Sequence, residues 1–131
     1  MVINEATYVD QAEKVIKELL ENKDKWGNPK PIKITTTKIR GLLAMSADIY
    51  NEIMYMEEKL PGEMCSKIDY LRVRFVYESG REPNTVKPFV ERARLIEALK
   101  EVGGSRIRFI QFNRYLEALV AFHKYYVGDD M

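Results

Sequence analysis

Three groups of cationic side chains have a spacing that suits phosphate binding. The first lies in the segment Thr35-Thr36-Thr37-Lys38-Ile39-Arg40, where threonines precede a helical pattern of apolar residues. A helix N-terminus offers free backbone amides and a partial positive charge, and both attract anions. Lys38 and Arg40 would add two charges to that first turn, which contains no acidic residue. The same segment is equally well explained as an ordinary threonine cap with two solvated cations.

The second group is a stripe in which cations alternate with tyrosines at steps of three and four residues. Its members are Lys67, Tyr70, Arg74, Tyr77 and Arg81. This spacing places all of them on one face of a helix, away from the apolar positions of the same segment. Such a surface can follow a nucleic-acid backbone and stack on bases. A subunit interface in which the tyrosines pack and the cations reach solvent would use the same pattern.

Arg72 and a third group of arginines need separate explanations. Arg72 falls at the edge of the apolar face, where a charge must either be paired or reach out to an anion. The third group is Arg106, Arg108 and Arg114, which belong to the last segment with helical periodicity. Arg106 and Arg108 fall in or near its first turn, again with no acidic neighbour there. A solvated face is the alternative explanation for this group.

The sequence gives no indication of a catalytic, metal or cofactor site. His123 is the single histidine, and no acidic residue or second histidine stands three or four positions from it. We therefore predict that His123 is a hydrogen-bonded core residue and Cys65 an inert, buried thiol. Glu57 and Glu58 are adjacent, so they diverge on a helix surface and are interpreted as a solvated turn. Phosphate-binding glycine loops are also absent, and we predict a protein that is not an enzyme.

Composition favours a soluble, folded protein with little overall charge. The chain has 131 residues, 46% of them hydrophobic, and a formal net charge of +1. The basic excess lies in residues 63–114, which hold eleven Lys and Arg against seven Asp and Glu. One cysteine cannot form an internal disulfide, and no apolar run approaches the ~20 residues of a membrane span. We therefore expect a cytoplasmic protein with no membrane contact, in which charge alone favours an ordinary mixed surface.

Apolar spacing predicts an all-α fold, a single compact bundle of about five helices in one domain over residues 1–131. A first helix is expected at about residues 5–21, with Val9 on its inner face. A linker over residues 22–34 follows, and its length leaves open the exchange of the first helix between two copies. Four further helices should occupy about residues 35–127, before a short tail at 128–131. Within that range we expect a helix that ends at Gly80, and another that runs unbroken from about Thr85 to Gly103-Gly104.

Three segments of the chain resemble one known family. They are Thr35–Arg40, the segment Tyr70–Arg81 (YLRVRFVYESGR) and the segment Arg114–Tyr126 (RYLEALVAFHKYY). Together, in this order and at these intervals, they are similar to the small subunit of type III-A CRISPR effectors, the Csm complex. The resemblance extends from about Tyr8 to Gly128, and the third segment is its most specific part.

The resemblance implies a helical subunit that stacks in a few copies along the guide RNA and the target RNA. Such a subunit contacts RNA backbones and neighbouring subunits, while target cleavage belongs to other subunits. Residues that match RNA-contacting positions of the family are Lys38, Arg40, Arg72, Arg81 and Arg114. Lys67 and Arg74 are RNA-binding candidates on the stripe argument alone. A protein-interaction module, in which the tyrosine face and the last helix build an oligomer without RNA contact, is the alternative.

Overall fold

The computed structural model describes residues 1–128; the last three residues of the predicted tail, 129–131, lie outside the described residues. Six α-helices account for most of this part of the chain, and no β-strand occurs in it, only two isolated bridges. The all-α prediction is therefore confirmed, with six helices in place of about five. Their bounds are α1 Tyr8–Leu20, α2 Thr36–Ile53, α3 Gly62–Arg81, α4 Val86–Ala93, α5 Leu95–Lys100 and α6 Arg106–Val127.

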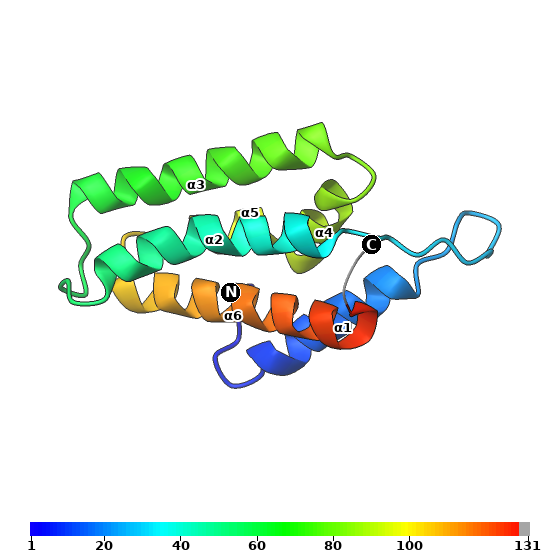
Figure 1. Cartoon of the computed structure of the whole chain (residues 1–131). Helices are drawn as coiled ribbons and strands as arrows, with labels where there is room; N and C mark the ends of the chain where they lie inside the picture. Colours follow the sequence, from blue (N-terminus) through cyan, green and yellow to red (C-terminus); the bar gives the residue numbers. More distant parts are fainter. Residues whose placement is uncertain (129–131) are drawn as a thin grey trace.

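The three long helices form a layer in which α2 lies between α3 and α6 (Figure 1). The short helices α4 and α5 pack against α3, and α1 packs against α6 and α4 of the same chain. One groove lies between α2 and α3, and a second lies between α2 and α6. These two grooves belong to the candidate site. No helix of the described part is both long and apolar enough to cross a membrane.

Aromatic residues from three helices form the centre of the core. Phe75, Phe89, Phe109 and Phe112 are all 0% exposed. The ring of Phe112 lies 6.2 Å from that of Phe75 and 5.8 Å from that of Phe109, measured between centroids. Contacts at these distances join α6 to α3. The inner faces predicted for these helices are accordingly buried, because helical periodicity places their apolar residues on one side.

Three predictions about the helices were wrong in detail. Val9 is 46% exposed and so does not belong to the inner face of α1. Gly80 does not end its helix, because α3 continues to Arg81 and the Glu82 amide still donates to the Glu78 carbonyl at 3.1 Å. The error at Gly80 arises because the sequence pattern predicts the helix but not its last turn, which tertiary packing stabilises.

The predicted fourth helix is divided into α4 and α5 at Arg94. This residue adopts a left-handed conformation with φ of 57°, although it is not glycine. Ala93 and Leu95, on either side of it, are 1% and 0% exposed. The left-handed turn at Arg94 therefore ends α4 and begins α5 between two buried residues.

His123 is 3% exposed, and its Nε2 lies 2.8 Å from the carbonyl oxygen of Ile34. A carbonyl oxygen only accepts, so Nε2 donates this hydrogen bond. The prediction of a hydrogen-bonded core histidine is thus confirmed. The bond ties the end of the 22–34 linker to α6, immediately before α2 begins.

Candidate nucleic-acid interface

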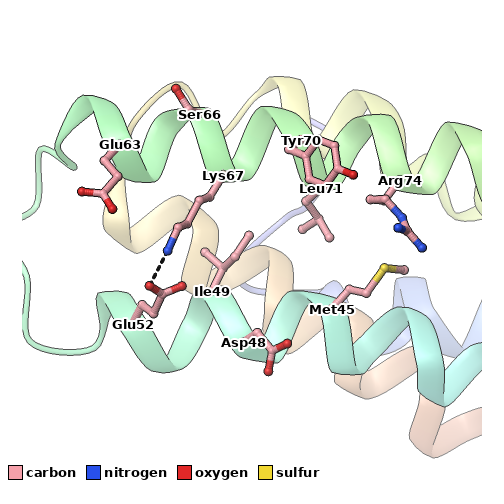
Figure 2. A pocket seen from close by; sticks show the side chains of 10 residues that line it. All are labelled: Met45, Asp48, Ile49, Glu52, Glu63, Ser66, Lys67, Tyr70, Leu71 and Arg74. Atoms are coloured by element: carbon pink, nitrogen blue, oxygen red, sulfur yellow. Dashed lines mark hydrogen bonds and ion pairs between the residues drawn. The ribbon is translucent and has the colours of Figure 1, made fainter.

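A groove between α2 and α3, with a volume of about 770 Å³, is lined by two of the predicted cations (Figure 2). We call it the α2–α3 groove. Its apolar lining includes Met45 and Ile49 of α2 and Leu71 of α3. Lys67 and Arg74 extend from α3 along its rim. The stripe spacing therefore predicted correctly that Lys67 and Arg74 share one face of the helix.

Both of these cations have an acidic neighbour. The Nζ of Lys67 lies 2.6 Å from Glu52 Oε1 across the groove, and this hydrogen bond raises the pKa of Lys67. A guanidinium nitrogen of Arg74 lies 3.5 Å from Glu78 on the same helix. The Nε of Arg74 is buried and has no hydrogen-bond partner among the described residues. Arg74 therefore retains donor capacity that the chain itself does not use.

Lys38, Arg74 and Arg81 meet two carboxylates at the C-terminal end of α3. Arg81 lies 3.7 Å from Glu78, and Lys38 of α2 lies 3.0 Å from Glu82. The Lys38–Glu82 pair joins the first turn of α2 to the residue after α3. The side chains of that pair are 36% and 35% exposed, so solvent screens the attraction and an incoming phosphate can compete for the lysine.

Arg40 lines a second groove, of about 330 Å³, on the other side of α2. We call it the α2–α6 groove, because Glu117 and His123 of α6 also line it. Thr35, which caps α2 by accepting a hydrogen bond from the Lys38 amide at 3.2 Å, confirms the predicted start of this helix within one residue. From the start of α2, Lys38 thus extends toward the end of α3 and Arg40 toward the α2–α6 groove.

Arg114 and Arg72 lie apart from these grooves. Arg114 is exposed on α6, and neither it nor Arg40 forms an ion pair with any described residue. Arg72 has Asp69 of its own helix at 3.9 Å. Two helical positions separate Arg72 from Arg74, which places the two side chains about 160° apart around the axis of α3. Arg72 therefore faces the flank of α3 that is turned away from α2.

Two arginines of the third group, Arg106 and Arg108, donate hydrogen bonds to backbone carbonyls of the protein itself. Arg106 donates from Nε to the Ile53 carbonyl at 2.9 Å and from a second guanidinium nitrogen to the Met54 carbonyl. Arg108 donates to the Glu101 carbonyl at 3.3 Å. The guanidinium groups thus satisfy backbone oxygens at the C-terminal ends of α2 and α5. Two of the three arginines in this group are consequently structural.

The N-terminus of α6 is already occupied by a carboxylate from a distant loop. Glu58 accepts hydrogen bonds from the Ser105 hydroxyl and, at 3.0 Å, from the Ile107 amide. The Ser105 hydroxyl, followed by that amide, lowers the pKa of the Glu58 carboxyl. Glu58 is exposed in the loop between α2 and α3, as the solvated-turn interpretation predicted, but its carboxylate also caps α6, which the sequence did not indicate. This helix end is filled, whereas the first turn of α2 contains no acidic residue.

Metal chemistry has no evident place in the described residues. They contain no group of three or more His, Cys, Asp or Glu residues that could hold a metal ion. Cys65 is only half-buried, less than predicted, and its Sγ lies 3.7 Å from the Leu60 carbonyl oxygen.

These features define a class: a small helical protein with exposed cations along shallow grooves between long helices. The sequence identifies the family within this class, because residues 13–129 match the family described as Csm2 Type III-A. The chain belongs to this family, which confirms the resemblance noted from its three segments.

Characterised relatives cover nearly the whole chain. A protein of Mycobacterium tuberculosis strain H37Rv, named CRISPR system Cms protein Csm2, is 43% identical over 126 residues, or 95% of each chain. Proteins of the same name from Streptococcus thermophilus and Enterococcus italicus are 42% and 33% identical. The first of these matches covers 98% of each chain, and the second covers 90% of this chain and 89% of the relative. The likeness is therefore not confined to one helix or one groove.

Proposed function

We propose that this protein is a non-catalytic small subunit of a type III-A CRISPR effector in the cytoplasm. It binds the backbones of the guide RNA and the target RNA without sequence specificity, and it stacks with copies of itself and other subunits. Membership of the Csm2 family supports the assembly, since the relatives are named as proteins of a CRISPR system. The grooves beside α2 support the contact with RNA.

The first turn of α2 is the observation that carries the proposed RNA contact. Lys38 extends from it toward the C-terminal end of α3, where Arg74 and Arg81 also lie, and Arg40 extends toward the α2–α6 groove. A phosphate chain that crosses this turn can meet cations on both sides and the N-terminal end of a helix dipole whose first turn contains no acidic residue. Contacts of this kind hold a backbone in place but do not read its bases.

The ion pairs of Lys38 and Arg81 do not prevent such contacts. A solvent-accessible pair such as Lys38–Glu82 contributes only about 0–1 kcal/mol, so exchanging its carboxylate for a phosphate costs little. Glu78, the partner of Arg81, also has Arg74 at 3.5 Å, so it keeps a cation when Arg81 turns to a phosphate. Arg40 has no partner to exchange within the described residues. We therefore expect Arg40 to contribute as much to RNA affinity as either of the paired cations, although it is a single side chain in a smaller groove.

Replacing Lys38, Arg40 and Arg81 together by alanine is expected to weaken RNA binding by the assembled complex roughly tenfold or more. Each lost phosphate contact removes about 0.7 from the log–log dependence of affinity on salt for single strands. The slope of the variant should therefore be shallower by about 2. Binding of labelled RNA, measured at several salt concentrations, tests both expectations.

The matched control removes three exposed lysines from the helices that lie away from these grooves: Lys14, Lys87 and Lys100. This variant changes the net charge by the same amount, so it should retain the parental slope. Equal affinities and slopes for the groove variant and its parent would show that phosphates do not bind here. Circular dichroism of both variants checks that the helices remain intact.

A second role, as a protein-interaction surface, is favoured by the outer face of α3. Tyr70, Val73, Val76 and Tyr77 are between 54% and 60% exposed, so this face presents apolar side chains to solvent. Replacing Tyr70 and Tyr77 by serine should reduce self-association measured by light scattering without RNA. Assembly that depends on these tyrosines but is indifferent to RNA and to the groove cations would favour the interaction module over the RNA-binding subunit.

A further inference from the structure

A basic hairpin joins α1 to α2 and presents the single tryptophan of the chain (Figure 1). We call residues 22–33 the Trp26 hairpin, since Trp26 lies at its turn. It begins and closes near α1, where Lys23 and Pro29 form an isolated bridge. Trp26 is 74% exposed, an unusual environment for the largest apolar side chain. Exposure of this kind indicates either a flexible loop or a surface that a ligand covers.

Hydrogen bonds within the turn favour the second explanation. Asp24 Oδ1 accepts from the amides of Trp26 and Asn28, each at 2.9 Å, and the hydrogen bond from Asn28 does most to lower the pKa of Asp24. The Lys30 amide donates to the Asn22 carbonyl at 2.8 Å. At the base, Arg92 of α4 donates to the Asn22 side chain at 3.1 Å. The backbone that carries Trp26 is therefore held in place before any ligand arrives.

The hairpin forms one wall of a hollow of about 760 Å³, and the loop between α3 and α4 forms the opposite wall. Pro83, Asn84 and Thr85 of that loop carry no charge. Four lysines line the hairpin side: Lys23, Lys25, Lys30 and Lys33. None of them forms an ion pair with a described residue. The one acidic residue in the lining is Asp24, and its Oδ1 already accepts hydrogen bonds from the two amides.

The indole ring of Trp26 lies beside these lysines and is accessible to a stacking partner. The Nζ of Lys25 lies 4.6 Å from the ring centroid, a cation–π contact that helps to hold the indole beside the lysines. Single-stranded nucleic acids bind to this combination of parts: an exposed aromatic ring on which a base stacks, and cations that meet the adjoining phosphates. A purely acidic peptide would match the lysines but leave the indole without a stacking partner.

We propose that the Trp26 hairpin is a second RNA-contact site, which takes an unpaired nucleotide of single-stranded RNA. Its base stacks on Trp26, and its flanking phosphates meet the four lysines. The base must be unpaired, because a paired base presents no free face to an aromatic side chain. This inference rests on the proposed RNA-binding function but uses none of the groove cations. The hollow lies beside the Lys38–Glu82 pair, since Pro83 of its lining directly follows Glu82.

The fluorescence of the single tryptophan gives a direct test on the purified full chain. Titration with a single-stranded oligouridylate at low salt should quench Trp26, because a base stacks on the indole. Replacing Trp26 by alanine should raise the Kd for labelled RNA about 5- to 150-fold, the range that corresponds to the loss of one stacked base. Replacing Lys23, Lys30 and Lys33 by alanine should make the salt slope shallower by about 2.

Tyr55→Ala is the matched control, because Tyr55 is a 97% exposed aromatic residue in the loop between α2 and α3. It should leave the Kd unchanged. An unquenched Trp26, or a Trp26→Ala variant that binds RNA as tightly as its parent, would overturn the proposal. Quenching by polyglutamate as strong as that by RNA would overturn it in favour of an acidic protein partner.

The two RNA proposals can fail separately. If the Lys38, Arg40 and Arg81 variant loses affinity while Trp26→Ala does not, the groove binds RNA and the hairpin proposal is wrong. If Trp26→Ala alone loses affinity, the hairpin proposal is supported and the groove proposal is wrong.

Discussion

Replacing Phe112 by alanine is expected to lower the free energy of unfolding by about 3–5 kcal/mol. Phe112 is 0% exposed, and its ring lies between those of Phe75 and Phe109. The substitution removes apolar contacts with both rings and leaves a cavity that a close-packed interior fills only in part. The loss concerns function as well as stability, because Phe112 and Phe75 connect α6 to α3, whose outer turns carry the groove cations.

Denaturant unfolding followed by circular dichroism measures this change. Tyr125→Ala is a suitable control on the same helix, since Tyr125 is 79% exposed and should change the stability by no more than about 0.5 kcal/mol. A loss below about 1 kcal/mol for Phe112→Ala would mean that the centre of the bundle is not packed as described. In that case the α2–α3 groove would also lack a fixed shape.

The helices themselves could be predicted because the information for them is local. Apolar residues at steps of three and four identified the inner faces of α2, α3 and α6. The N-caps of α2 and α6 are equally local: Thr35 accepts from the Lys38 amide, and Ser105 accepts from the Arg108 amide. A cap depends on side chains within three residues of one another, so the sequence contains the whole interaction.

The partners of the charged residues could not be predicted in the same way. Lys67 is paired with Glu52 and Lys38 with Glu82, and both pairs join separate helices. Spacing along one helix says nothing about which residue of another helix lies opposite. The break at Arg94 could not be predicted either, because Arg94 adopts a left-handed conformation without being glycine, so the sequence carries no local breaker there.

The sequence interpretation also overlooked the Trp26 hairpin as a candidate site. Its glycine and prolines were used only to assign a linker, and an ordered turn was not expected there. The available signal was a single tryptophan within a stretch of four lysines and one aspartate, residues 22–33. A tryptophan in a polar linker has no core to enter, so its presence indicates a partner more strongly than the surrounding charge does.

Replacing Arg106 by methionine is expected to destabilise the protein by about 2–4 kcal/mol, because it removes two charge-assisted hydrogen bonds to backbone carbonyls. Those acceptors are the carbonyl oxygens of Ile53 and Met54 at the end of α2. Methionine keeps much of the apolar stem of the side chain, so the change reports mainly on the guanidinium. Arg114→Met removes the same charge from an exposed position of the same helix and should change the stability by no more than about 0.5 kcal/mol.

This pair of variants separates structural arginines from candidate RNA-binding arginines, which the sequence places on one helix without distinction. Thermal unfolding gives the stability of each variant, and RNA binding by the assembled complex gives the other measurement. Arg106→Met should lower the melting temperature, whereas Arg114→Met should lower RNA affinity without changing the melting temperature. If Arg106→Met proved as stable as its parent, the guanidinium would not hold the end of α2, and Arg106 would again be a candidate for phosphate contact. Because α2 carries Lys38 and Arg40 at its other end, the anchoring of this helix by Arg106 also fixes the position of the proposed RNA contacts.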